Sequence, residues 1–262
     1  MTAWAGGPAG EQALCVLAPN PGPMTLDGTN TWVLHSPGSR DALVVDPGPD
    51  DERHLRAVAD VVERRGARVA EVLLTHGHLD HSEGAAAFAR LTGARGVRAL
   101  DPAHRLGAEG LADGDVVTAG GVEVRVVATP GHTSDSLSFV LVGERAVLTG
   151  DTVLGRGTTV VAHPDGRLAD YLDSLRRLRA LAAATEVTTV LPGHGPVLPD
   201  ALAAVDGYLA HRRERLAQVE AALEAGARTP REVVEIVYAD VDRALWPAAE
   251  LSVRAQLEFL RR

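Results

Sequence analysis

The sixteen residues 73–88, LLTHGHLDHSEGAAAF, constrain this chain most, because an apolar run there meets three histidines and an aspartate within six positions. Alternate side chains of an extended segment face the same way, so His76, His78 and Asp80 are expected to converge. His81 is expected in the first turn of the helix that follows. Imidazole nitrogens and carboxylate oxygens suit Zn²⁺ and similar divalent ions. The stretch therefore predicts a metal site rather than a set of polar caps.

Three more ligand-type residues follow apolar runs elsewhere in the chain. His132 lies in VVATPGHTSDS, Asp151 in AVLTGDT and His194 in VLPGHGP. Each is predicted on a loop at the end of a strand, where a rigid scaffold commonly holds functional side chains. With the first cluster they make seven candidate ligands.

The hydrophobic pattern up to about residue 198 predicts short strands alternating with helices and turns. Strands are expected at 29–36, 41–46, 70–75, 122–129, 137–143, 145–151 and 187–193. Helices are expected at 51–66, 82–93 and 169–184. Several strands are too close for a crossover helix, so the pattern indicates a mixed sheet or two stacked sheets flanked by helices.

The character of the chain changes after residue 200. One long amphipathic helix is predicted up to Gly226 from the spacing of its apolar residues, Leu202, Val205, Leu209, Leu216, Val219 and Leu223. A second helix should begin at Thr229, which precedes proline and stands three residues before Glu232. A last helix is expected within PAAELSVRAQLEFLRR. The predicted organisation is a catalytic domain at 1–200 and a small helical domain at 201–262.

Composition limits the class of protein. With 262 residues, a net charge of −9 and a pI of about 5.6, the chain has no strong attraction for nucleic acid or anionic membranes. Cys15 is the one cysteine, so no internal disulfide forms, no disulfide-linked partner is expected, and a reducing compartment fits best. We expect Cys15 to be a small core residue. The N-terminus lacks the features of a signal peptide and no apolar run could span a membrane, which predicts a soluble cytoplasmic protein.

The segment THGHLDH resembles the H-x-H-x-D-H signature of the metallo-β-lactamase fold superfamily, and His132, Asp151 and His194 follow in the expected order. The resemblance runs from about residue 14 to 198. It implies an α+β fold, a four-layer αβ/βα sandwich with two metals at one edge of the sheets.

The resemblance also implies a role for each site residue. The first metal would be held by His76, His78 and His132, and the second by Asp80, His81 and His194. Asp151 would bridge the two metals. Asp46, at the end of ALVVD, matches an aspartate that supports the metal loop. Two Zn²⁺ per chain are expected, and Mn²⁺ or Fe²⁺ occur in relatives.

Within the superfamily, Asp151 stands where true two-zinc β-lactamases carry cysteine, which disfavours antibiotic hydrolysis. The pattern around His78 and Asp80 and the lack of a flavodoxin-like segment disfavour flavodiiron oxygen reductases. The segments GTNTWVL, DPGPDD, TGDTVLGRGTT and LADYLDSL, with the helical tail, resemble the LACTB-two-like group, whose C-terminal domain is winged-helix-like. Known members include an endoribonuclease for single-stranded RNA and thioesterases acting on carrier-bound polyketides.

The expected chemistry is hydrolysis, with a metal-bridging hydroxide as the nucleophile and Asp80 as both ligand and water-orienting group. The chain lacks G-x-S-x-G and a convincing Ser-His-Asp set, which agrees with that chemistry. The first substrate hypothesis is single-stranded RNA. The alternative is an ester or thioester, as in glyoxalase II or carrier-protein thioesterases. His163 is expected on a solvated loop rather than against the substrate.

A third hypothesis, from a different class, is a non-enzymatic DNA-binding module built on the tail. Arg212, Arg213 and Arg215 would form its basic stripe, although Glu214 and Glu220 interrupt that stripe. Seven intact candidate ligands disfavour this reading.

Overall fold

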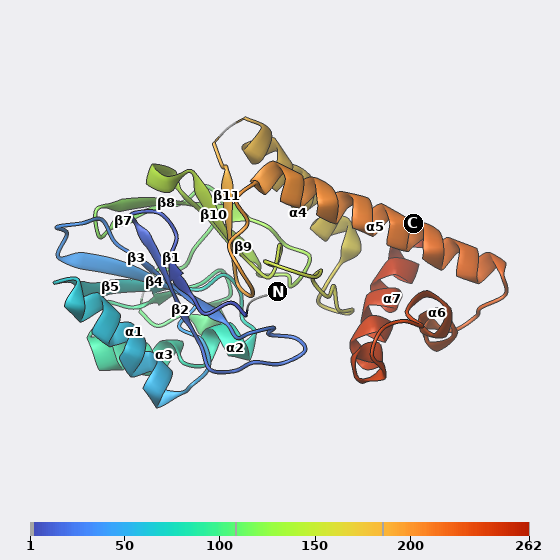
Figure 1. Cartoon of the computed structure of the whole chain (residues 1–262), viewed down its shortest axis with the longest axis horizontal. Coiled ribbons are helices and arrows are strands. Elements are labelled where there is room, and N and C mark those ends of the chain that lie inside the picture. Colours follow the sequence, from blue (N-terminus) through green and yellow to red (C-terminus); the bar gives the residue numbers. More distant parts are fainter. Residues whose placement is uncertain (1–2, 108, 185, 262) are drawn as a thin grey trace.

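The computed structural model describes residues 3–107, 109–184 and 186–261, and its centre is a pair of β-sheets packed face to face (Figure 1). In the first sheet β1 to β4 are antiparallel, and β4, β5 and β6 run parallel. Its strands, in spatial order, are β1 (Gly7–Pro8), β2 (Ala13–Leu17), β3 (Asn30–Leu34), β4 (Asp41–Val45), β5 (Arg68–Leu73) and β6 (Val97–Arg98).

The second sheet is antiparallel from β7 to β10, and β11 is added parallel to β10. Its strands are β7 (Val116–Ala119), β8 (Val122–Ala128), β9 (Leu137–Leu141), β10 (Ala146–Gly150) and β11 (Thr189–Pro192). Side chains alternate between two apolar clusters: Phe139 and Leu148 lie between the sheets, whereas Val140 and Val147 face the helices outside. Both faces of this sheet are therefore buried.

Helices cover the outer face of each sheet, which completes the predicted four layers (Figure 1). On the first sheet, α1 (Glu52–Arg64) and α3 (Ala85–Thr92) bury Val58 and Phe88 against strand residues such as Val44. On the second sheet, α4 (Leu168–Ala183) and the first half of α5 (Ala201–Glu224) do the same with Leu175 and Val205. The one-turn helix α2 (Leu79–Ser82) lies between β5 and α3.

The last helices, α6 (Pro230–Val237) and α7 (Trp246–Leu260), pack beside the outer half of α5 (Figure 1). They share a separate apolar cluster with α5 that includes Val219, Val233 and Val253. The predicted start of α6 is confirmed: Thr229 and Glu232 form a reciprocal capping box. No strand occurs in the part of 201–262 that the structure describes. The domain boundary at 200/201 stays a prediction, because α5 packs with both halves of the molecule.

None of the helices within the described ranges is long and apolar enough to span a membrane. Cys15 is 3% exposed in β2, as expected of a core residue.

Candidate metal centre

All seven predicted ligands lie at one edge of the sandwich, at the carboxyl ends of strands. His76 and His78 follow β5, and Asp80 and His81 lie in α2. The other three follow β8, β10 and β11 and are, in order, His132, Asp151 and His194. Strand ends far apart in the sequence thus place these side chains together.

Three imidazoles form the first group, His76, His78 and His132. Nδ1 of His78 lies 3.1 Å from Nε2 of His76 and 3.1 Å from Nε2 of His132. A tetrahedral ion with Zn–N bonds of about 2.0–2.1 Å holds its ligand atoms about 3.3 Å apart. The nitrogens therefore have the spacing of ligands to one ion.

The second group is Asp80, His81 and His194. Nε2 of His81 lies 3.3 Å from Nε2 of His194, and Oδ2 of Asp80 lies 3.4 Å and 3.2 Å from these two nitrogens. This group, too, fits a single divalent ion.

Asp151 lies between the two groups. Its Oδ1 is 3.4 Å from Nε2 of His81, and its Oδ2 is 3.3 Å from His194 and 3.8 Å from His132. Among the described residues, none donates a hydrogen bond to the buried Oδ1. Leaving a buried carboxylate oxygen without a donor is costly, and a bound cation removes that cost. The carboxylate is thus suited to contact ions on both sides.

Backbone carbonyls set the tautomers of two of the histidines. Nδ1 of His132 lies 2.8 Å from the carbonyl of Val160, and Nδ1 of His194 lies 3.1 Å from that of Gly28. A carbonyl only accepts, so each Nδ1 carries a proton, and in the neutral ring each Nε2 presents a lone pair to the site. Both rings are held in the form that binds metal.

Asp46 orients a ligand in each group. Its carboxylate accepts from the backbone N–H of Thr75 at 2.8 Å, from the Thr75 hydroxyl at 2.6 Å and from Nδ1 of His81 at 2.9 Å. Since the hydroxyl proton of Thr75 is used on Asp46, its oxygen accepts from Nδ1 of His76 at 3.0 Å. The backbone of Asp46 adopts φ of 50°, a conformation that is uncommon for residues other than glycine.

The two carboxylates of the centre are ionised at neutral pH. Burial raises the pKa of Asp80, but His81 and His194 outweigh it and bring the pKa to about 2. Burial likewise opposes ionisation of Asp151, yet His194 and His81 hold its pKa well below the usual range. Burial also lowers the pKa of His194, but Asp151 outweighs it and raises that pKa to about 9. Metal binding at His194 therefore competes with a proton.

The predicted convergence holds for His76 and His78 but not for Asp80. Residue 79 begins α2, so the extended segment ends before Asp80, whose carboxylate joins the second group instead. His163 lies on a loop, as expected, with Nε2 3.6 Å from a carboxylate oxygen of Glu258 in α7. The proposed basic stripe on the tail does not form, because Arg212 is only 4% exposed.

Two supporting residues, Thr29 and Asn30, were missed from the sequence, which places them in the strand predicted at 29–36 without assigning them a role. Asn30 donates to the carbonyls of Pro192 and Gly195, at 2.9 and 2.8 Å, and so fixes the turn that carries His194. Thr29 donates to Asp80 at 3.3 Å. The signal in the sequence was an asparagine within a predicted strand, because such an amide needs hydrogen-bond partners once the strand is buried.

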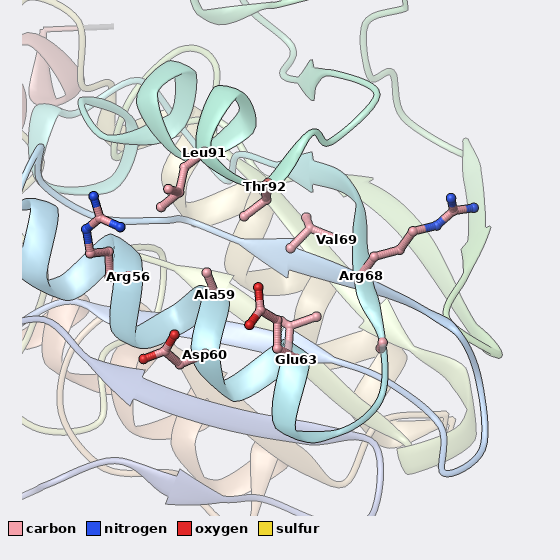
Figure 2. Close-up of a pocket in the computed structure, with 10 residues that line it drawn as sticks. Arg56, Ala59, Asp60, Glu63, Arg68, Val69, Leu91 and Thr92 are labelled. Carbon is pink, nitrogen blue, oxygen red and sulfur yellow. The ribbon is translucent and has the colours of Figure 1, made fainter.

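Two other features lie outside this centre. A hollow of about 240 Å³ between α1 and α3 is lined by exposed charged residues such as Arg56 and Arg68, which pair with Glu52 and Asp41 (Figure 2). It contains none of the predicted ligands. The half-exposed group Asp101, His104 and Asp135 uses carboxylates that already cap local backbone or hydroxyl groups, so we assign it no role.

Comparison with known proteins matches the two parts of the chain to two family models. Residues 24–194 match the metallo-beta-lactamase superfamily, and residues 229–262 match the beta-lactamase associated winged helix domain. The first model covers β3 to β11 with all seven candidate ligands, and the second covers the last two helices.

Relatives extend over most of the chain. The "Atrochrysone carboxyl ACP thioesterase" of Aspergillus fumigatus is 35% identical over 239 residues, which are 85% of this chain and 72% of that protein. The "Beta-lactamase-like protein 2 homolog" of Caenorhabditis elegans is 33% identical over 255 residues, 94% of this chain and 82% of that protein. A beta-lactamase domain protein from Burkholderia ambifaria has the same fold, with a TM-score of 0.82, 23% identity and coverage of 100% and 89% of the two chains.

Proposed function

The chain belongs to the metallo-beta-lactamase superfamily and is a hydrolase of that group, and on this basis we propose that it cleaves small acyl thioesters with the help of two divalent metal ions. The observation that carries the proposal is the convergence of seven ligand-type side chains in two neighbouring groups, with Asp151 between them and no hydrogen-bond donor to its buried Oδ1 among the described residues. A few ordinary hydrogen bonds would be enough to stabilise the fold at this edge, so the fold itself does not require this cluster.

The three imidazoles of the first group would hold one ion, and Asp80, His81 and His194 the other, with Asp151 shared. Bound there, a pair of divalent ions supplies Lewis acidity and lowers the pKa of water. Zn²⁺ is the first choice for these nitrogen and oxygen donors.

Asp80 is the carboxylate of the centre best placed to act on the attacking water. Its side chain is 29% exposed, whereas that of Asp151 is 11% exposed. It is ionised at neutral pH, and the Thr29 hydroxyl holds the oxygen nearest His194. We assign Asp80 the orientation of the water and acceptance of its proton.

Two observations favour a thioester over RNA. A relative covering most of the chain is named as a carrier-protein thioesterase. A net charge of −9 also repels a polyanion, because affinity for nucleic acid rests mainly on phosphate contacts by cationic side chains. RNA stays a prediction that the same experiment tests.

The experiment compares the zinc-loaded protein on an acyl thioester and on a labelled single-stranded RNA. We expect thioester hydrolysis that is lost in Asp151→Ala and kept in Asp173→Ala, an exposed carboxylate on α4. Cleavage of RNA with the same dependence on Asp151, and no thioester hydrolysis, would transfer the assignment to a phosphodiesterase. Turnover of neither substrate would contradict the proposed reaction.

A further inference from the structure

A cavity of about 210 Å³ lies between the sandwich and the last helices. Four parts of the chain form its walls: Pro23 and Met24, the segment 158–160, α5, and residues 238–252. A water occupies about 30 Å³, so the space suits a group the size of several waters. It therefore accommodates part of a small molecule rather than a folded partner.

One wall of the cavity is basic. Arg212 and Arg215, three positions apart on α5, line it together with His211. Among the described residues that line the cavity, there is no aspartate or glutamate. The wall is thus cationic and lacks a neutralising carboxylate, in a chain whose net charge is −9.

Arg212 is the most unusual member of this wall, since it is buried and still has unused hydrogen-bonding capacity. Its Nη2 donates to the carbonyl of Thr159 at 2.5 Å, and its guanidinium lies 4.8 Å from the ring centre of Tyr171. Within the described residues, Nε has no hydrogen-bond partner, and the cavity next to Arg212 is lined by no carboxylate. A buried guanidinium in this condition is stabilised by an anion.

Arg215 and His211 extend the same surface. Arg215 donates to the carbonyl of Val237 at 2.8 Å and stacks 4.5 Å from the ring centre of Tyr238, so its guanidinium is held in place. Nδ1 of His211 is buried without a partner among the described residues. Fixed donors lose little conformational freedom when a ligand binds.

Another part of the lining is apolar. Met24, which is 50% exposed, Val241, Leu245 and Ala248 form it. An alkyl chain fits such a wall, while an oxyanion at its end would meet the guanidiniums.

The cavity also adjoins the candidate metal centre through one short segment. Thr159, which gives its carbonyl to Arg212, contacts the carbonyl of Asp151 through its hydroxyl. Val160 lines the cavity, and its carbonyl fixes His132. A molecule held in the cavity is therefore next to Thr159 and Val160, which contact the candidate ligands Asp151 and His132.

We propose that this cavity binds a carboxylate or phosphate at the far end of the acyl chain of the substrate, with Arg212 and Arg215 as the residues that recognise it. The inference rests on the proposed function, which identifies the substrate as an acyl compound. It adds a preference for anionic over neutral acyl chains that the metal centre does not supply.

The test measures binding of hydrolysis-resistant thioethers, so that it requires no turnover. Three analogues of S-hexyl-N-acetylcysteamine would be titrated calorimetrically into the full-length, metal-loaded protein: the neutral compound, its ω-carboxylate and its ω-phosphate. Hydrogen bonds to charged groups predict that at least one anionic analogue binds about tenfold or more tightly than the neutral one. Which anion binds better identifies the group that the cavity takes.

Variants decide whether the cavity causes the preference. Arg215→Gln and Arg212→Gln should reduce it to about threefold or less, since a neutral amide replaces the guanidinium. Arg213→Gln removes the same charge from an exposed position of α5 outside this cavity and should keep the preference. If circular dichroism shows that Arg212→Gln does not fold, the test relies on Arg215→Gln alone.

Equal affinity for the three analogues, a preference unchanged in Arg215→Gln, or no measurable binding would overturn the inference. A protein that hydrolyses no thioester but keeps the Arg-dependent preference would instead contradict only the proposed reaction. The two failures are therefore distinguishable.

Discussion

Oδ2 of Asp46 lies 2.9 Å from Nδ1 of His81 and also accepts the hydroxyl of Thr75 at 2.6 Å. One carboxylate oxygen therefore fixes a ligand of the second group directly and, through Thr75, a ligand of the first. Neither contact requires Asp46 to touch a metal. This arrangement makes Asp46 the shared support of both groups.

Asp46→Asn should weaken metal binding without unfolding the protein. The amide has a single acceptor oxygen, so it cannot replace all three bonds that Asp46 accepts from Thr75 and His81. Loss of such outer contacts typically lowers metal affinity by about 10–100-fold. Competition with a chromophoric chelator measures the change, with Asp41→Asn at the half-buried start of β4, away from the centre, as the control. Unchanged affinity in Asp46→Asn would leave the carboxylate without this supporting role.

Asp151→Ala should lose metal from both groups at once. Its two oxygens lie 3.3–3.8 Å from nitrogens of His81, His194 and His132, which belong to different groups. Elemental analysis of protein purified without chelator should give about two metals per chain for the wild type and for Asp173→Ala, and well under one for Asp151→Ala. Full metal content in Asp151→Ala would remove the bridging role.

The sequence predicted that these side chains would come together, because most of them follow strands that their own local pattern reveals, and the structure brings them into neighbouring groups. That they bind metal stays a prediction. Asp151 and His194 follow apolar runs that became β10 and β11, and those neighbouring parallel strands end at one edge. The start of α6, capped by Thr229, was predictable because a capping box is a local signal.

Features that depend on distant partners were missed. The strand β2 was not predicted, because its five residues carry no turn or alternation signal and its place is set by pairing with β3, as Cys15 with Trp32. Burial of Arg212 was also missed, since its partners Thr159 and Tyr171 lie on other elements. Local pattern gives an arginine on a helix no reason to turn inward.

Cys15 should make stability fall at alkaline pH. Burial raises the pKa of its thiol to about 12. In the unfolded chain the thiol ionises near about pH 8.5, so above that pH the unfolded state loses a proton that the folded state keeps. The free energy of unfolding therefore decreases as pH rises from about 8.5 toward 12.

Urea unfolding of wild type and Cys15→Ala, with reductant, at about pH 8 and pH 10 measures this contribution. The free energy of unfolding should fall by about 1–2 kcal/mol more in the wild type than in the variant over that interval, because only the wild type has the thiol. Tyrosines and other groups contribute equally to both proteins and cancel in the comparison. Parallel pH dependence in the two proteins would show that the thiol ionises as readily folded as unfolded.

Asp80→Asn separates two roles of the aspartate between His78 and His81. If Asp80 only held metal, the amide oxygen would partly replace its carboxylate, and activity would follow metal occupancy. We expect a larger loss, because the ionised Asp80 is the accessible carboxylate of the centre and is assigned the proton of the attacking water. Loss of a general base costs about 10²–10⁴-fold in kcat, or roughly 3–5 kcal/mol of transition-state stabilisation.

The first group contains no atom of Asp80, so at least one metal per chain should remain in the variant. The measurement is kcat on the acyl thioester at saturating zinc, with metal content determined on the same sample. Asp173→Asn, on the exposed face of α4, controls for the change of charge. A fully metallated Asp80→Asn protein with kcat within about threefold of wild type would leave Asp80 a ligand and no more, because a general-base contribution is far larger.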